Sequence, residues 1–382
     1  MKRTAAFLLC FLLVAVSVPP RAVAKSGGGI SAKAYILMEA ATGRILAAAN
    51  ENTRLPIAST TKILTALITL EQPSLDSYFT VNADAIKVEG SSMGLREGDS
   101  VSLNGLATGM LLASGNDAAN AAAVKIAGSI EKFSGLMNQK AKELGMENSH
   151  FVTPSGLPND DHYSTAADMA LLARHALQNE RFAAICTKSS AKLSFGNPPF
   201  DRWLYNHNRL LEDYPGCIGI KTGFTKKAGR CLVSAARRDG VTLICVTLSD
   251  PNDWRDHAAL LDTGFAQTEK RELSVSTQDI SLDVVGGMQD RLAVEPLAPV
   301  YSCVLPEQEK TLVRTVCVEP FYYAPVHAGD IVGEIRYYYN GFEVASADLV
   351  AADDVPADLR PRKKSIFDKI KDFLSEHFRM AN

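Results

Sequence analysis

Apolar residues near the start of the chain recur first with the period of strands and then with the period of a helix. Residues 34–39 and 44–48 are short apolar runs on either side of residues 41–43, Ala-Thr-Gly, which predicts a β-hairpin. In residues 59–68 the apolar positions follow helical spacing. We therefore expect a hairpin followed by a helix that begins at Ser59.

The middle of the chain has a predominantly helical pattern. Residues 106–145 are rich in Ala, Leu and Met, and Gly145 is a suitable C-terminal cap. Residues 151–165 are rich in Pro, Gly, Asn and Asp, which indicates a loop. A further helical pattern covers residues 166–178. We therefore expect a layer of helices interrupted by one long loop.

Strand patterns return after these helices. Residues 216–222, 229–237 and 241–248 are strand-like, and an Asp-Gly pair joins the last two. A helix over residues 260–265 is expected to close the domain. Strands at both ends with helices between them predict an α+β domain, in which one antiparallel sheet assembled from both ends is covered by helices.

A second, β-rich domain is predicted downstream. A chain of 382 residues exceeds what one hydrophobic core usually organises. From residue 272 to about residue 354, short alternating runs are broken by Pro and Gly, without a convincing helical pattern. The sequence thus predicts a first domain over residues 25–271, a β-rich domain over residues 272–355, and a linker with a terminal helix over residues 356–382.

The first 24 residues have the layout of a cleavable secretory signal. A basic start precedes an apolar run over residues 5–18 that is short for a membrane span, and residues 22–24 are Ala-Val-Ala. We expect residues 1–24 to be removed, which leaves Lys25 as the mature N-terminus; an uncleaved anchor helix is the alternative. Both interpretations predict export of the rest of the chain.

Composition and cysteines narrow the possible partners. The chain is 46% hydrophobic and 22% charged with a formal net charge of -3, so no excess of charge points to nucleic acid. Outside the cytosol, Cys303 and Cys317 could close a hairpin by a disulfide. The three cysteines from Cys217 to Cys245 lie in strand-like runs and are interpreted as buried apolar thiols. No spacing of cysteine and histidine is typical of zinc, so neither a metal nor a cofactor is expected.

The first candidate for chemistry is the pair Ser59 and Lys62 at the start of the predicted helix. Three residues is close to one helical turn, so the hydroxyl and the amine face the same side. A serine hydroxyl needs a positioned base to become a good nucleophile, and a lysine serves when burial and nearby positive charge lower its pKa. Alone, this spacing is also compatible with a capped surface helix.

Two further motifs follow in chain order. Residues 114–116, Ser-Gly-Asn, separate two helical segments; the hydroxyl can relay a proton and the amide can orient a base. Residues 221–223, Lys-Thr-Gly, lie in a strand-like run, where the lysine supplies positive charge and the glycine lets a ligand backbone approach. Each motif alone is common in structural roles. All three in this order, on the elements that the chemistry requires, predict a serine acyl-transfer site.

Along nearly all of its length, the chain resembles the low-molecular-mass penicillin-binding D,D-carboxypeptidases. Besides the three motifs, the resemblance rests on PIASTTK at 56–62, SSMGL at 91–95, TPSGL at 153–157, HYSTA at 162–166 and KTGFT at 221–225. It implies a β-lactamase/transpeptidase-like fold, with an antiparallel sheet covered by helices, then a small β-rich domain and a membrane-associated C-terminal amphipathic helix.

The resemblance also implies catalytic roles. Ser59 would be the acyl acceptor and Lys62 its base. Ser114 and Asn116 would relay protons, and Lys221 would be the electrostatic partner of the site.

Substrate binding is implied for Thr222, Gly223, Phe224, Thr225 and Arg255. The backbone N–H groups of Ser59 and Phe224 would form the oxyanion hole, and Thr222 and Thr225 would hold the substrate carboxylate. Arg255 stands where the family often places a carboxylate-steadying arginine. Since His207 occupies a place where some members carry an arginine, carboxylate recognition is expected to rest more heavily on Arg255.

The implied reaction starts when Ser59 attacks the carbonyl between the two D-alanines of a peptidoglycan stem peptide ending in D-Ala-D-Ala. The terminal D-alanine leaves and water releases the acyl-enzyme, whereas β-lactam antibiotics would acylate the same serine and persist. A class A β-lactamase needs a loop glutamate, usually in Glu-x-x-Leu-Asn, and none occurs between Asp117 and Lys221. A D,D-endopeptidase remains open, while a non-catalytic peptidoglycan-binding protein would not need a nucleophile beside a base.

The C-terminal tail combines one apolar face with basic residues. The apolar positions at helical spacing are Ile366, Phe367, Ile370, Phe373, Leu374 and Phe378. A basic amphipathic helix of this kind predicts that residues 362–380 bind an anionic membrane surface, at the extracytoplasmic face of the bacterial cell membrane. The alternatives are a helix packed on the second domain and a homodimer contact.

Overall fold

The structure of the protein is a computed structural model that describes residues 29–360, 367 and 369–371. The predicted signal peptide lies outside the described residues, and so does the predicted anchor helix apart from residues 367 and 369–371. Within the described ranges, no helix has both the length and the apolar character that crossing a bilayer requires.

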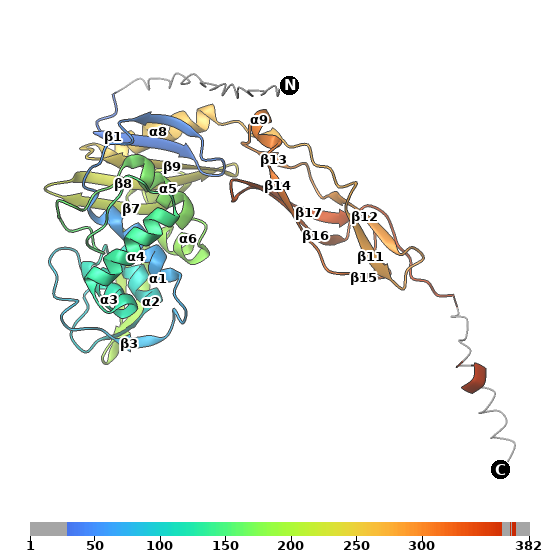
Figure 1. The fold of residues 1–382 in the computed structure, drawn as a ribbon, viewed down its shortest axis with the longest axis horizontal. Coiled ribbons are helices and arrows are strands. Elements are labelled where there is room, and N and C mark those ends of the chain that lie inside the picture. The colour runs from blue at the N-terminus through green and yellow to red at the C-terminus, as the bar shows by residue number, and fades with distance from the viewer. Residues whose placement is uncertain (1–28, 361–366, 368, 372–382) are drawn as a thin grey trace, which may run out of the picture. The chain divides into compact units, whose positions relative to one another are not determined.

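The chain forms two compact units. The first holds the residues up to Glu39 together with Arg44–Gln267, and the second holds Ala40–Gly43 together with the residues from Thr268 onwards. The first unit contains, in chain order (Figure 1), β1 Ala34–Glu39, β2 Ile45–Ala49, the 3-10 helix η1 Ala58–Thr61, α1 Lys62–Leu70, β3 Tyr78–Thr80, β4 Ser100–Ser102, α2 Leu103–Leu111, α3 Asn116–Ala127, α4 Ile130–Glu143, α5 Ala166–Ala176, α6 Glu180–Cys186, β5 Ser190–Gly196, β6 Pro199–Tyr205, α7 Leu210–Asp213, β7 Cys217–Thr225, β8 Gly229–Arg238, β9 Val241–Leu248 and α8 Asp253–Gln267.

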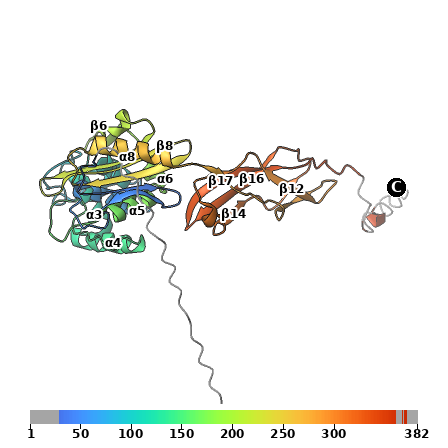
Figure 2. The same ribbon diagram turned by 90° about the horizontal axis from the view of Figure 1, so that it is seen from above.

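One antiparallel sheet organises the first unit, with the strand order β2-β1-β9-β8-β7. The strand β1 pairs with β2 on one side and β9 on the other, so both ends of the unit's sequence meet within the sheet. The helix α8 covers one face of the sheet and α5 lies against the other (Figure 2). His257 of α8 hydrogen-bonds with Ser234 of β8 and Thr247 of β9. This arrangement confirms the predicted α+β domain.

Most of the predicted elements are present, with shifted ends. The expected hairpin is β1 and β2, the long helical region is α2 to α4, and the later strands are β7 to β9. Gly145 follows α4 with a φ of 79°, as expected for a glycine that ends a helix. One prediction is corrected, because α8 begins at Asp253 instead of residue 260. The hairpin of β5 and β6 is an additional element that the sequence pattern does not predict.

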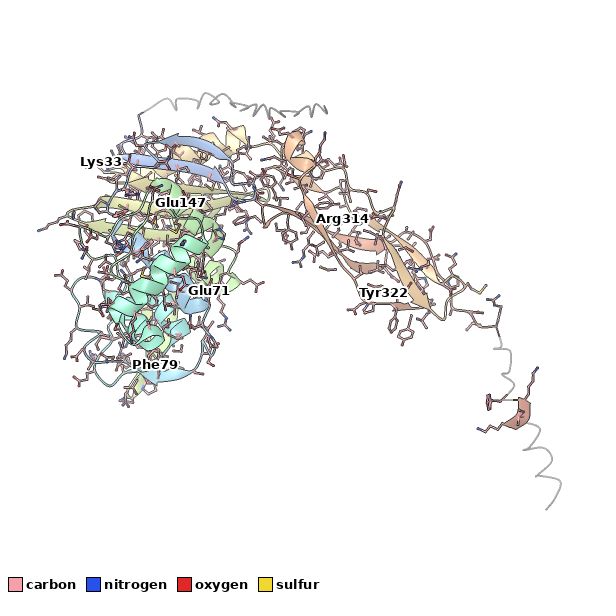
Figure 3. The ribbon with its side chains drawn as sticks, viewed as in Figure 1. Lys33, Glu71, Phe79, Glu147, Arg314 and Tyr322 are labelled. Carbon is pink, nitrogen blue, oxygen red and sulfur yellow. The ribbon has the colours of Figure 1, made fainter. Side chains whose placement is uncertain are left out.

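The second unit is β-rich, as predicted. Its elements are β10 Arg271–Glu272, β11 Ser281–Val285, β12 Arg291–Pro296, β13 Tyr301–Ser302, α9 Pro306–Glu309, β14 Val313–Cys317, β15 Tyr322–Tyr323, β16 Ile331–Tyr339 and β17 Phe342–Ala351. The larger sheet has the order β14-β16-β17-β12-β11-β15 around an apolar core that includes Leu292, Ile335 and Leu349. Arg314 and Tyr322 lie on its outer strands, β14 and β15 (Figure 3). The short helix α9 is a feature that the sequence does not predict.

The possible disulfide between Cys303 and Cys317 is not formed in the structure. Cys317 ends β14 and is paired with Glu334 of β16, whereas Cys303 follows β13, which belongs to a separate two-stranded sheet. Cys231 and Cys245 are buried in the sheet of the first unit, which confirms their interpretation as buried thiols, whereas Cys217 is only partly buried.

Candidate active site

The candidate site begins at the turn that carries Ser59. The helix η1 continues directly into α1, and Ser59 is the second residue of η1. Ala58 has a φ of 49°, a strained conformation of the kind that clusters at functional sites. A β-carbon on Gly223 of β7 would lie 3.1 Å from the backbone nitrogens of Ser59 and Thr60. The glycine therefore lets the strand lie directly against the turn that bears the serine.

Lys62 connects the serine to the rest of the site. Its Nζ lies 3.0 Å from Ser59 Oγ, 2.7 Å from Asn116 Oδ1 and 2.7 Å from the carbonyl oxygen of Ser155. The amide oxygen and the backbone carbonyl can only accept hydrogen bonds, so they take both hydrogens of a neutral amine. The lone pair of that amine is then directed at the Ser59 hydroxyl, which is the geometry of a general base beside its nucleophile.

Burial lowers the pKa values of both lysines of the site, and the charge of Lys221 adds to the shift of Lys62. Lys62 and Lys221 are both almost completely buried. Burial and the charge of Lys221 hold the pKa of Lys62 well below its ordinary range, against the opposing effect of Asp117. Burial lowers the pKa of Lys221 to about 7. The site thus favours an unprotonated Lys62, as a base requires.

The residues of the Ser-Gly-Asn motif lie between α2 and α3. Ser114 is buried with a φ of 57°, and Asn116 is the first residue of α3. Asn116 donates from its backbone N–H to the carbonyl of Ser91 at 2.7 Å and from Nδ2 to the carbonyl of Glu89 at 2.6 Å. These two bonds fix the amide so that its oxygen points at Lys62.

Asp117 holds the neighbouring loop, a role that the sequence does not predict. Its carboxylate accepts from the backbone N–H groups of Met93, Gly94 and Leu95 and from the Ser92 hydroxyl, at 2.6 to 3.1 Å. The side chain is 2% exposed. An acidic residue in the first turn of a helix is a common sequence signal, but its partners 22 to 25 residues away are not visible in the sequence.

A second loop reaches the site from residues 153–157. Ser155 supplies the carbonyl that accepts from Lys62. Gly156 has a φ of 82°, and a β-carbon there would overlap the carbonyl of Ala58. Only glycine lets this loop lie directly on the turn that carries the nucleophile.

His162 ties the same loop to η1, and it is a second residue whose role the sequence does not predict. Its Nδ1 accepts from the backbone N–H groups of Val152 and Thr153 at 3.1 and 3.3 Å, so the ring proton is on Nε2. Nε2 then donates to Thr61 Oγ1 at 2.8 Å, and the Thr61 hydroxyl donates to the carbonyl of Ala58. Burial lowers the pKa of His162 to about 4, which keeps the ring neutral.

A pocket of about 430 Å³ opens above these groups. Its lining residues are Ser59, Glu89, Gly90, Ser91, Asn116, Ser155, Gly156, Leu157, Pro158, Phe224, Thr225, Lys226 and Lys227. Phe224 and Thr225 thus border it together with the serine, as the sequence predicts. Thr222 lies beside Lys221, whose Nζ donates to the Thr222 carbonyl at 3.0 Å.

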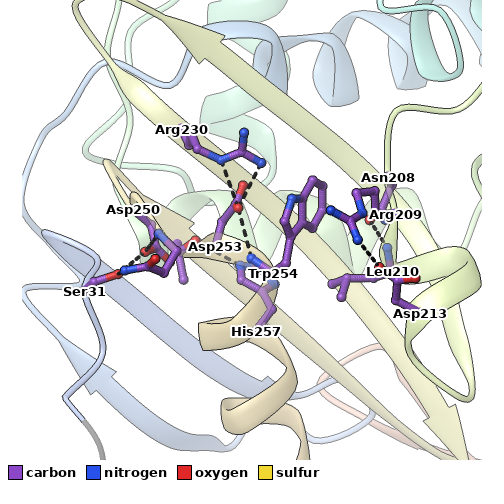
Figure 4. A network of polar contacts seen from close by, with 12 residues as sticks. Ser31, Asn208, Arg209, Leu210, Asp213, Arg230, Asp250, Asp253, Trp254 and His257 are labelled. Carbon is purple, nitrogen blue, oxygen red and sulfur yellow. Dashed lines mark hydrogen bonds and ion pairs between the residues drawn. The ribbon is translucent and has the colours of Figure 1, made fainter.

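The structure does not bring Arg255 to this pocket. It lies on α8, where its Nε and Nη2 donate to Asp256 at 3.0 and 2.9 Å. The start of α8 carries a polar network, in which Arg230 of β8 donates to Asp253 at 2.9 Å (Figure 4). His207 is the residue that stands where some family members carry an arginine. Its pKa is lowered by burial and by the charge of Lys221.

Comparison with family models and curated proteins gives matches over both units. A model described as D-alanyl-D-alanine carboxypeptidase matches residues 21–252, and one described as penicillin-binding protein 5, C-terminal domain, matches residues 274–357. D-alanyl-D-alanine carboxypeptidase DacF of Bacillus subtilis (strain 168) is 31% identical over 371 residues, covering 93% of this chain and 95% of its own. The DacC carboxypeptidase of Escherichia coli (strain K12) is 32% identical over 397 residues, covering 98% and 94%.

Solved structures agree with these matches. The DD-transpeptidase of Streptomyces K15 is 32% identical with a TM-score of 0.60, covering 63% of this chain and 98% of its own. D-alanyl-D-alanine carboxypeptidase DacD from Francisella tularensis is 27% identical with a TM-score of 0.59, covering 89% and 98%.

Proposed function

This chain belongs to the D-alanyl-D-alanine carboxypeptidase family, and we propose that it removes the terminal D-alanine from peptidoglycan stem pentapeptides through an acyl-enzyme on Ser59. The observation that carries the proposal is the setting of Lys62. Two acceptor-only oxygens, from Asn116 and Ser155, occupy its hydrogens and leave its lone pair for the Ser59 hydroxyl. A purely structural lysine has no need of this arrangement.

Acylation follows from that geometry. Lys62 takes the proton of Ser59 as Oγ bonds to the carbonyl carbon between the two D-alanines. The backbone N–H groups of Ser59 and Phe224 stabilise the oxygen that becomes negative. As the C–N bond breaks, the proton passes from Lys62 by way of Ser114 to the leaving amine. D-alanine departs, and the acyl group stays on Ser59.

Deacylation uses the same base. A water molecule replaces the departed amino acid, and Lys62 accepts its proton as the water oxygen bonds to the acyl carbon. The ester bond to Ser59 then breaks, and Lys62 returns the proton to Ser59 Oγ. A β-lactam acylates Ser59 by the same attack. Its ring-opened leaving group stays attached, which obstructs the water and makes the adduct long-lived.

Lys221 and its neighbours bind the substrate carboxylate in this proposal. Lys221 lies at the edge of the sheet beside the pocket, and a bound carboxylate stabilises its charged form and raises its pKa. Thr222 and Thr225 donate hydroxyl hydrogen bonds to the same group, and Gly223 lets the peptide backbone approach β7. Arg255 has no part in this scheme, because Asp256 holds its guanidinium.

The test is mass spectrometry of a defined stem pentapeptide after incubation with the enzyme. We expect loss of one alanine with the wild type and none with Ser59→Ala. Lys62→Arg is the matched variant, because it keeps a long side chain with hydrogen-bond donors but stays protonated and cannot act as a base at neutral pH. An unchanged rate in Lys62→Arg would contradict the assigned role of Lys62.

A fluorescent penicillin separates this function from its alternatives. Stable labelling that disappears in Ser59→Ala supports the carboxypeptidase. Rapid release of hydrolysed penicillin supports a β-lactamase instead, and no labelling of the wild type supports a non-catalytic binding protein.

We further propose that the enzyme is exported and held at the membrane surface. Residues 1–24 would act as the signal, residues 25–271 as the catalytic domain and residues 272–355 as the β-rich domain. The basic amphipathic residues 362–380 would bind anionic lipid. Sedimentation with vesicles containing anionic lipid tests this: we expect the full mature chain to sediment and a chain ending at residue 361 to stay in solution. Equal sedimentation of both would refute the anchor.

A further inference from the structure

The hairpin of β5 and β6 has two faces of different character. Its register is continuous, with Lys192 paired with Trp203 and Ser194 with Asp201. Because side chains alternate along a strand, Trp203 shares one face with Tyr205, Asp201 and their partners across the hairpin. Arg202 and the other even-numbered residues of β6 lie on the opposite face.

The even-numbered face is fixed to the first unit by Arg202. Its guanidinium lies 4.0 Å from the ring centroids of both Phe195 and Phe200. It also donates to the carbonyl of Gly94 and, at 3.3 Å, to Asp99. Stacking on two rings and pairing with a buried carboxylate hold the hairpin in one orientation. The outer face is therefore presented on a rigid support.

The outer face exposes large aromatic rings among polar groups. Trp203 is 57% exposed and Tyr205 is 64% exposed. Lys192 forms an ion pair with Asp201 at 2.7 Å on the same face. The chain has 2 tryptophans, and one of them lies on this exposed strand. Exposed rings of this size usually mark a binding surface, because water is a poor environment for them.

Both ends of the hairpin lead to the active site. At its base, the Asn206 backbone N–H donates to the Ser189 carbonyl at 2.7 Å, and the next residue, His207, is close enough to Lys221 for the two charges to repel. Farther along, Arg202 holds Gly94, which belongs to the same loop as Ser91 at the pocket wall. The hairpin is thus bound to a loop that contributes to the pocket wall, and the chain leaves it towards Lys221.

We propose that the outer face of the β5–β6 hairpin binds the glycan strand to which the stem peptide is attached. Sugar rings would stack on Trp203 and Tyr205, while Lys192 and Asp201 hydrogen-bond with hydroxyl and acetamido groups. Side chains two residues apart on a strand lie about 6.8 Å apart, so neighbouring sugars can each meet one ring. This inference rests on the proposed function, since it requires that the substrate is peptidoglycan.

The composition of the face favours a carbohydrate over other occupants. The residues of β5 and β6 that point outward are Ser190, Lys192, Ser194, Asp201, Trp203 and Tyr205, after Pro199 at the tip. Flat rings separated by charged and hydroxyl groups match a sugar, which has apolar ring faces and polar edges. Lipid chains and the apolar faces of helices need aliphatic surface, and this face provides none.

The test compares insoluble and soluble substrates with a Trp203→Ala/Tyr205→Ala double variant. We expect binding to purified peptidoglycan sacculi to fall at least 5-fold in a pelleting assay, and D-alanine release from sacculi to fall in parallel. Release from a free pentapeptide, which lacks sugar, should stay within 2-fold of the wild type. Tyr301→Ala is the matched control, because Tyr301 is 50% exposed on the second unit; it should behave as the wild type.

Competition identifies the ligand. Peptide-free glycan fragments should displace the wild type from sacculi. They should also quench the tryptophan fluorescence of the wild type. In Trp203→Phe, the only quenching should be that of the remaining tryptophan. Unchanged pelleting of the double variant overturns the proposal, and so does displacement by free pentapeptide alone. If the wild type binds sacculi but releases no alanine from either substrate, the proposed function fails while the glycan site stands.

Discussion

Replacement of Asp117 by asparagine gives a direct measure of how the wall of the pocket is held. Oδ1 of Asp117 accepts from the backbone N–H groups of Met93 and Ala118, both at 2.9 Å. Oδ2 accepts from the backbone N–H groups of Gly94 and Leu95 and from a serine hydroxyl. Whichever way the amide is placed, its NH₂ group faces two backbone donors.

The magnitude follows from that count. A hydrogen bond to a charged partner contributes about 1.5 to 3 kcal/mol, so loss of two lowers the free energy of unfolding by about 3 to 6 kcal/mol. That is a large share of the roughly 5 to 15 kcal/mol that stabilises a typical domain. Asp117→Asn should therefore show a clear decrease in the urea midpoint, measured by circular dichroism.

The same variant should change the pH dependence of acylation. The carboxylate of Asp117 raises the pKa of Lys62, so its removal lowers that pKa further. Since Lys62 must be unprotonated to accept the serine proton, the acidic limb of the penicillin acylation rate should move to lower pH. The rate is measured by stopped-flow fluorescence at a series of pH values on the protein that remains folded.

Asp168→Asn is the matched control for this experiment. The carboxylate of Asp168 is also buried and accepts hydrogen bonds from the Asn148 backbone N–H and the Ser149 hydroxyl. The charges that shift the pKa of Lys62 are those of Lys221 and Asp117, and Asp168 is not among them. It should lose stability without a shift of the acidic limb. The reasoning is refuted if the limb of Asp117→Asn stays in place or moves to higher pH.

Three further changes test other parts of the site. Lys221→Met should abolish acylation yet raise the free energy of unfolding at pH 6 by up to about 5 kcal/mol, measured by urea titration. The pKa of the lysine is about 7 in the folded chain and 10.5 in the unfolded chain, so the stability of the wild type rises with pH between these values. The greater stability of the variant should therefore disappear above that window. Gly156→Ala should lose penicillin labelling and stability, whereas Gly98→Ala, with the same φ of 82° but no atom near the added carbon, should lose only the smaller strain energy. Between pH 6.5 and about 4, the unfolded wild type binds a proton at His162 and the folded wild type does not, so the free energy of unfolding falls as the pH decreases. His162→Gln should make this fall less steep. An unchanged slope would contradict the neutral ring assigned to His162.

Local patterns in the sequence predict the elements that carry the catalytic groups. Ser59 and Lys62 share one turn, Asn116 starts a helix and Lys221 lies in a strand, and each position follows from periodicity and turn residues over fewer than 20 residues. Glycine is also informative, because Gly223 leaves the space that the turn at Ser59 occupies.

The sequence pattern does not predict the hairpin of β5 and β6, and the reason is physical. Its outer positions carry Trp203 and Tyr205, which a binary pattern counts as apolar, while the fixed face carries a half-buried Arg202. These three residues of β6 interrupt the expected alternation, although Phe195 and Leu204 on the fixed face are buried. The role of Arg255 stays a prediction from chain position; the structure shows that the neighbouring Asp256 binds its guanidinium.

The basicity of Lys62 is the property that sequence motifs describe least well. Side chains specify only one of the acceptors that orient its amine, Asn116; the other is the backbone carbonyl of Ser155, a group that every residue possesses. That carbonyl is in place because Gly156 can lie on the Ala58 carbonyl and because His162 ties the loop to the turn. A motif therefore identifies which groups can react, whereas the protonation state that allows the reaction depends on loop backbone that a motif does not record. Variants of such supporting residues should change the pH dependence of acylation before they change which residue is acylated.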